Sequence, residues 1–110
     1  MSYDIDLRAK VEGVDEYVDI ADAWVNITWN VRELIEHSSG WIIKNEDNNG
    51  LAGDLNKLLI HGIHELENHP DQYRQYEAKN GWGTIESTLR FYKELRRLCR
   101  KYPFAYVFVY

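Results

Sequence analysis

The chain has 110 residues, 45% of them hydrophobic, which is enough to bury one core but too little for two. We therefore expect a single domain over residues 1–110, folded without disulfides or metal ions. The formal net charge of −5 argues against general duplex nucleic-acid binding, because such binding draws its affinity from neutralising phosphates. No apolar run approaches the roughly 20 residues that span a bilayer, so we expect no membrane insertion.

The lone Cys99 and an N-terminus without a signal-peptide pattern predict a cytoplasmic protein.

Charge is unevenly distributed along the chain. Residues 84–102 carry six cationic side chains against two glutamates, whereas the remainder carries nine net negative charges. An acidic body with one basic helix is compatible with a small anionic ligand held at a local basic site.

The first half of the chain reads as strands followed by a short helix. Alternation of apolar and polar residues predicts strands at 3–8 and 24–29, and a less regular pattern predicts a strand at 14–20 that forms a hairpin with the first. Asn30 and Glu33 have the spacing of a capping box, which predicts a helix over 31–37.

The second half is predicted to be mostly helical. Residues 44–50 read as a polar loop, and an apolar stripe predicts a helix over 52–68, followed by a linker after Pro70. A stronger stripe predicts a helix over 85–102, and the apolar segment 104–110 predicts a central strand covered on both faces. We expect an α+β fold, a small largely antiparallel sheet with about three helices packed mainly on one face.

The stretch AWVNITWN places three neutral polar side chains, Asn26, Thr28 and Asn30, at alternate positions of a predicted strand. Amides and hydroxyls both donate and accept hydrogen bonds, as a polar ligand or a structural network requires. The pattern leaves these two interpretations open. A helix cap alone explains Asn30, but it does not explain the other two.

Aromatic residues beside these amides suggest a ligand surface. Four Trp and eight Tyr exceed what a core of this size needs, and one Trp lies between glycines in the turn NGWG. A cation of the last helix, Arg90 or Arg97, would contact an anionic group. The candidate ligand-binding residues are Asn26, Thr28, Trp29, Asn30, Trp82, Arg90 and Arg97.

The segment HGIHELENH resembles a zinc-protease motif but misses its spacing, because His69 follows His64 by five residues, which rotates it about 140° around a helix. His61 and His64 are expected to face solvent, although His61 and Glu65 could weakly hold a divalent ion. Cys99 lies on the apolar stripe and is expected in the core. We predict no catalytic residue, no metal and no cofactor.

Five aspartates near the N-terminus raise the alternative of a Mg²⁺ site for phosphoryl transfer. They are Asp4, Asp6, Asp15, Asp19 and Asp22. Alternation places Asp4 and Asp6 on an exposed strand face, which favours simple solvation.

Several motifs together resemble a group of small accessory proteins of bacteriophage and prophage genomes. They are YDIDLR, AWVNITWN, HPDQY, NGWGTIESTLRFYKELRRLC and KYPFAYVFV, which span nearly the whole chain. The segment WIIKNEDNNG departs from the tighter Gly-containing turn expected there. The resemblance implies a phage protein acting in the host bacterial cytoplasm, where proteins of this size often antagonise defence by binding an effector or sequestering a nucleotide signal.

We therefore expect a non-enzymatic binding protein, an anti-defence factor that blocks a host defence protein or sequesters a small nucleotide. Two alternatives stay open. One is a metal-dependent phosphoryl-transfer enzyme, a nuclease or phosphodiesterase. The other is a self-assembling interaction module that forms a homo-oligomer.

Overall fold

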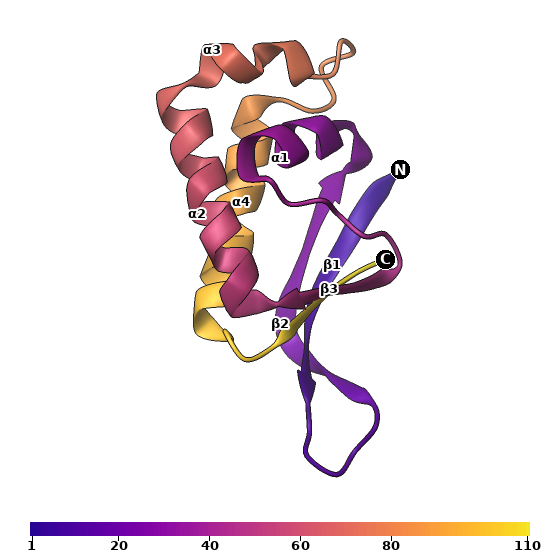
Figure 1. Ribbon diagram of the computed structural model, residues 1–110. Helices are drawn as coiled ribbons and strands as arrows, with labels where there is room; N and C mark the ends of the chain where they lie inside the picture. The colour runs from indigo at the N-terminus through magenta and orange to yellow at the C-terminus, as the bar shows by residue number, and fades with distance from the viewer.

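The computed structural model describes residues 1–110 and contains one four-stranded sheet with helices between its strands in the chain (Figure 1). The strands are β1 (Ser2–Lys10), β2 (Tyr17–Thr28), β3 (Asp47–Leu51) and β4 (Tyr106–Val109). The α-helices are α1 (Arg32–Ser39), α2 (Ala52–Asn68), α3 (Pro70–Tyr73) and α4 (Ile85–Lys101). Two short 3-10 helices are η1 (Trp29–Val31) and η2 (Arg74–Tyr76). None of the helices has the length and apolar character that crossing a membrane requires.

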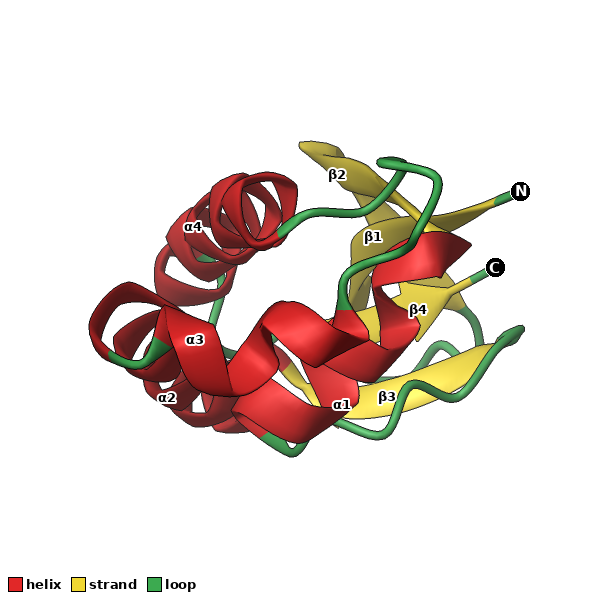
Figure 2. Ribbon diagram, turned by 90° about the horizontal axis from the view of Figure 1, so that it is seen from above, coloured by secondary structure: helices red, strands yellow, loops and turns green.

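The sheet is antiparallel throughout, with the strand order β2-β1-β4-β3. The helices gather on one side of it (Figure 2). This arrangement confirms the predicted α+β fold. Four α-helices form where about three were expected, because the segment predicted as a linker begins with α3, which has Pro70 in its first turn, where its missing N–H is not needed.

Strand β2 joins two segments that were predicted as separate strands, 14–20 and 24–29. Its pairing with β1 shifts register between Asp6 and Arg8, and Asp22 has a φ of 63°. An irregularity of this kind bends a strand and interrupts the alternation of its side chains. The sequence pattern therefore looked like two short strands.

Helix α1 does not use the predicted capping box of Asn30 and Glu33. The chain first makes the 3-10 turn η1, for which Thr28 is the cap, with its Oγ1 accepting a weak 3.4 Å hydrogen bond from the N–H of Asn30. The residue before α1 is Val31, whose side chain cannot cap. The capping prediction was wrong because the polar residue that caps lies two positions earlier.

Strand β3 begins within the segment predicted as a polar loop, 44–50. Asn49 organises this segment, because its Oδ1 accepts hydrogen bonds from the backbone N–H of Lys44 at 2.8 Å and from Nε1–H of Trp41 at 3.2 Å. Asp and Asn have low strand propensity, so the strand was hidden from sequence patterning. Hydrogen bonds to the side-chain amide of Asn49 hold the segment in place instead.

The core lies between the sheet and the helices, and α2 meets α4 at Gly62. A Cβ on Gly62 would lie 2.7 Å from Cε2 of Tyr92, so only glycine permits this approach. The hydroxyl of Tyr92 is buried and lies 2.7 Å from Oγ of Ser38 and 3.2 Å from the carbonyl oxygen of Ile35. Burial raises the pKa of Tyr92 to about 12, and the residue acts as a neutral core side chain.

Strand β4 is central, as predicted, but helices cover only one of its faces. On the other face Tyr106 and Phe108 are half-buried, and the guanidinium of Arg8 lies 4.3 Å from the centre of the Phe108 ring. Asp6 shares this face but is only 8% exposed, in contrast to the solvated position predicted for it. It is tolerated there because Nε of Arg8 donates a 2.9 Å hydrogen bond to its carboxylate.

Candidate functional site

The polar row of β2 lies on the solvent side of the sheet. Asn26 is exposed, and its Nδ2 lies 2.8 Å from the carboxylate of Asp4 and 3.0 Å from Oγ of Ser2. Thr28 caps η1, and the side chain of Asn30 is exposed. The row is therefore not a buried network, and its first amide is accessible to a ligand.

The direction of the backbone hydrogen bonds in β1 fixes which groups of β2 are paired. Asp4 exchanges both of its backbone bonds with Tyr110, at 2.8 and 2.9 Å, so its N–H and C=O face β4. Neighbouring residues of an antiparallel strand alternate in direction. The backbone groups of Tyr3 and Ile5 therefore face β2.

Strand β2 is an edge strand, and half of its backbone groups point away from the sheet. Val25 and Ile27 stand opposite the β1 residues that face β2, so their backbone groups are paired. The residues beside them, Trp24 and Asn26, direct their N–H and C=O groups to the free edge. An edge of this kind is a template for one further strand.

Figure 2 shows α4 as the helix nearest to β2. A groove of about 480 Å³ lies between residues of this strand and of α4. Its walls are Trp24, Val25, Asn26 and Ile27 of β2 and Ser87, Arg90, Phe91 and Glu94 of α4. The two aliphatic residues and Phe91 are buried, whereas the other residues are exposed or half-buried. We name this feature the β2–α4 groove.

Arg90 is the free cation of the β2–α4 groove. It is exposed and belongs to none of the ion pairs of the structure. Glu94, in contrast, lies 2.6 Å from the guanidinium of Arg97, and this hydrogen bond lowers the pKa of Glu94. The unpaired guanidinium can therefore bind a carboxylate that enters the groove.

Arg97 lies in a different setting from Arg90. It lines a second depression, of about 440 Å³, whose walls are all cationic. These residues are Lys93, Arg96, Arg97, Arg100 and Lys101. The cations of the last helix thus divide between this cluster and the groove.

Asn30 and Trp82 are brought near one another by a close backbone contact. A Cβ on Gly83 would lie 3.0 Å from Cβ of Asn30, so the turn that carries Trp82 packs against this residue. Trp82 is 71% exposed, whereas Trp29 packs on Tyr3 with ring centres 5.7 Å apart. Of the predicted site residues, only Asn26 and Arg90 line the β2–α4 groove.

Two aspartates of the enzymatic alternative are engaged in ion pairs, whereas Asp15 and Asp22 are exposed. One guanidinium, that of Arg8, lies 2.9 Å from Asp6 and 3.1 Å from Asp19. Cys99 is buried, as predicted, and burial raises the pKa of its thiol to about 12. A protonated thiol in the core is not a nucleophile at neutral pH.

A cluster of His64, Glu65 and His69 forms where α2 ends. Their potential ligand atoms all lie within 4.8 Å of one another. The predicted separation of the two histidines around a helix was wrong, because α2 stops at Asn68 and His69 leaves helical geometry, with φ −131° and ψ 46°. Tyr73 donates a 2.7 Å hydrogen bond to Glu65, and this bond is the main reason for the lowered pKa of that carboxylate.

Sequence reasoning missed six groove residues, which are Trp24, Val25, Ile27, Ser87, Phe91 and Glu94, although the sequence contained signals for several of them. Trp24 alternates with Asn26 and so shares its strand face. Ser87 and Glu94 stand three residues before and four residues after Arg90, which places them beside it on a helix. No local pattern showed that this helix face, with Phe91, lies against β2.

Known proteins offer no assignment for the β2–α4 groove. A scan of family models, a search of curated proteins and a search of solved structures each found no match to the chain. The functional argument therefore depends on the geometry of the groove and on the chemistry of its walls.

Proposed function

We propose that the chain is a non-enzymatic binding protein that takes an extended segment of a partner protein into the β2–α4 groove. The observation that carries this proposal is the free backbone edge of β2 beside an open groove. A bound segment would add a fifth strand, with its backbone bonded to the N–H and C=O groups of Trp24 and Asn26. Strand addition of this kind takes its affinity from backbone bonds and its specificity from pockets for alternate side chains.

The walls of the groove define the segment that fits. Side chains of an added strand alternate between the two faces of the sheet. Those directed to α4 meet the buried apolar surface around Phe91 and the free charge of Arg90. Those on the other face lie along Trp24, which is 54% exposed. The preferred segment is apolar with one acidic residue placed for Arg90.

The choice of partner is supported by the resemblance to bacteriophage accessory proteins. That resemblance supports a host defence protein as the partner and steric block in the host bacterial cytoplasm as the mode of action. A small nucleotide is the weaker proposal, because the residues suggested for it divide among three settings. These are Asn26 with Arg90, Asn30 with Trp82, and Arg97 in the cationic cluster.

Selection from a library of displayed random peptides tests the proposal. We expect enrichment of sequences that alternate apolar residues and contain Asp or Glu. Asn26→Pro removes one outward N–H and the side-chain bonds of Asn26 to β1, but no backbone bond to β1, and an edge strand tolerates proline at such a position. This variant should lose binding of the selected peptides, whereas Arg100→Glu should keep it.

Arg90→Glu makes the same change of charge as Arg100→Glu, at another position of the same helix. It should abolish binding of acidic peptides, because it replaces attraction by repulsion inside the groove. The proposal fails if no peptide family is enriched, or if selected peptides bind both Asn26→Pro and Arg90→Glu with unchanged affinity while circular dichroism shows that the variants are folded.

A further inference from the structure

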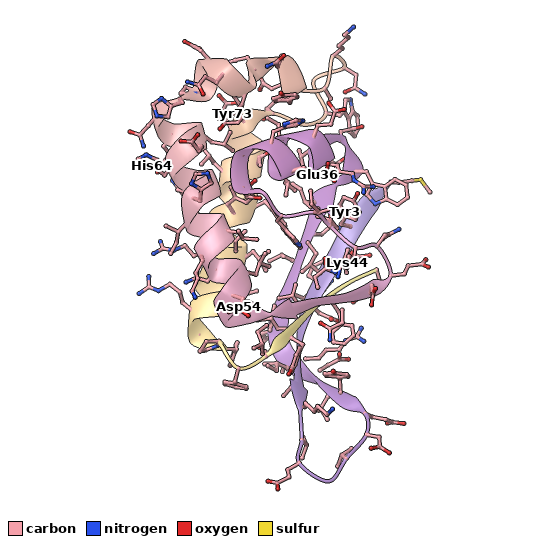
Figure 3. The ribbon with its side chains drawn as sticks, viewed as in Figure 1. Tyr3, Glu36, Lys44, Asp54, His64 and Tyr73 are labelled. Atoms are coloured by element: carbon pink, nitrogen blue, oxygen red, sulfur yellow. The ribbon has the colours of Figure 1, made fainter.

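We propose that His64, Glu65 and His69 form a zinc-binding site at the junction of α2 and α3, a property independent of the β2–α4 groove. The three side chains offer two imidazole nitrogens and one carboxylate oxygen within 4.8 Å of one another. Figure 3 labels His64 on α2 and Tyr73 on α3, at the end of the molecule where these helices meet.

The change of backbone direction at His69 brings the ligands together. Within a straight helix, His64 and His69 would project about 140° apart. His69 instead lies between α2 and α3, and its ring centre comes 6.2 Å from that of His64. Its Nε2 lies 3.9 Å from Oε2 of Glu65. Small rotations of exposed side chains would bring three donors to the distance of about 2.0–2.1 Å that zinc requires.

A neighbouring side chain already orients one of the three ligands. The hydroxyl of Tyr73 donates to Oε1 of Glu65 at 2.7 Å, which leaves Oε2 directed toward His69. Nδ2 of Asn68 donates to Nδ1 of His64 at 3.2 Å, so zinc binding at this nitrogen would displace the amide. A hydrogen-bond partner that fixes a ligating carboxylate, as Tyr73 does, is a regular feature of protein metal sites.

The donor set selects the class of metal ion. Two imidazoles and one carboxylate suit Zn²⁺ and related transition ions better than Mg²⁺ or Ca²⁺, which prefer oxygen donors. Three protein ligands leave one tetrahedral position for water or for a donor from another molecule. His64 and His69 are exposed, so the ion can enter from solvent without opening the core.

Calorimetric titration of the chain with ZnCl₂, after removal of any polyhistidine tag, tests this proposal. We expect one Zn²⁺ per chain and a melting temperature that rises with Zn²⁺, because binding to the folded state alone stabilises it. His64→Ala and His69→Ala should each weaken Zn²⁺ binding by more than about 100-fold, since even the loss of an outer partner costs about 10- to 100-fold. Tyr73→Phe should weaken Zn²⁺ binding by about 10- to 100-fold, because it removes only an outer partner.

His61→Ala is the matched control, because His61 is an exposed histidine of the same helix outside the cluster. It should keep both the stoichiometry and the affinity of the unchanged chain. Absence of saturable Zn²⁺ binding would overturn the proposal. Equal losses in His61→Ala and His64→Ala, with circular dichroism unchanged, would also overturn it, because they would indicate diffuse binding to surface histidines.

Discussion

Helix α4 has two sides that differ in how completely they are packed. Toward α2 and the core, Tyr92 and Leu95 are fully buried, and the contact at Gly62 leaves no room for a methyl group. Toward β2, the helix presents Ser87 and Arg90 to an open groove beside unpaired backbone groups. One side of the helix therefore stabilises the fold, while the other is available for binding.

This difference means that stability and binding should respond to different substitutions in the same helix. Substitutions that leave a cavity or add atoms on the packed side of α4 should lower the free energy of unfolding. Changing exposed residues of the groove should change peptide affinity and leave folding largely intact, since surface substitutions away from special features usually stay within about 0.5 kcal/mol.

The largest effect is expected at Leu95, which has no exposed surface. Leu95→Ala should lower the free energy of unfolding by about 2–5 kcal/mol, because it leaves a cavity among packed side chains. Urea denaturation measures this change, and Leu89→Ala should cost less because Leu89 is only half-buried. Equal losses of unfolding free energy in the two variants would contradict the difference between the packed and open sides of α4.

Gly62→Ala should be the next most damaging change. The added Cβ would lie 2.7 Å from a ring carbon of Tyr92, and overpacking of this kind costs about 1–3 kcal/mol despite the better helix propensity of alanine. The double variant Gly62→Ala/Tyr92→Leu should cost less than the sum of its single changes. Strict additivity in urea denaturation would mean that the two residues do not meet.

Two exposed tryptophans test the binding side of the comparison. Trp24→Ala should weaken selected peptides about thirtyfold, because truncation of an aromatic hot spot costs about 2 kcal/mol. Trp82→Ala, which removes the more exposed ring, should leave affinity unchanged. Fluorescence anisotropy of a labelled peptide gives both values, and the reverse ranking would move the site to the turn at Trp82.

The smallest effect concerns the contact between Tyr73 of α3 and Glu65 of α2. Tyr73→Phe removes the hydrogen bond that lowers the pKa of Glu65, so this pKa should rise in an NMR titration. A lowered folded-state pKa stabilises the fold above the unfolded pKa, and the benefit is lost as pH falls through the folded value. The variant should therefore lose less stability than the unchanged chain on acidification. An unchanged pKa for Glu65 would show that the bond has no electrostatic effect.

The packed side of α4 could be predicted from sequence because helical periodicity is a local property. Tyr92, Leu95 and Cys99 fall on one stripe of the printed sequence, and all three are buried. The central position of β4 was likewise predicted correctly from its apolar run. The predicted cover on both of its faces was wrong, because a local apolar run does not show which face of a sheet the helices cover.

The β2–α4 groove could be predicted only in part. The alternation around Asn26 indicated a polar strand face, either a ligand surface or a structural network, and the basic helix indicated a cation for the site, Arg90 or Arg97. Their proximity depends on β2 being the edge strand nearest to α4, which is a property of the whole topology. The meeting of His64 and His69 was missed for a similar reason, since it depends on where α2 ends.

Amide hydrogen exchange of β2, followed residue by residue by NMR, tests the central claim most directly. In the free protein, the amides of Val25 and Ile27 should exchange slowly, because they are paired with β1, and those of Trp24 and Asn26 should exchange quickly. Addition of a selected peptide should slow exchange at Trp24 and Asn26 alone within the strand. A peptide that binds without slowing these two amides would contradict strand addition at the β2–α4 groove.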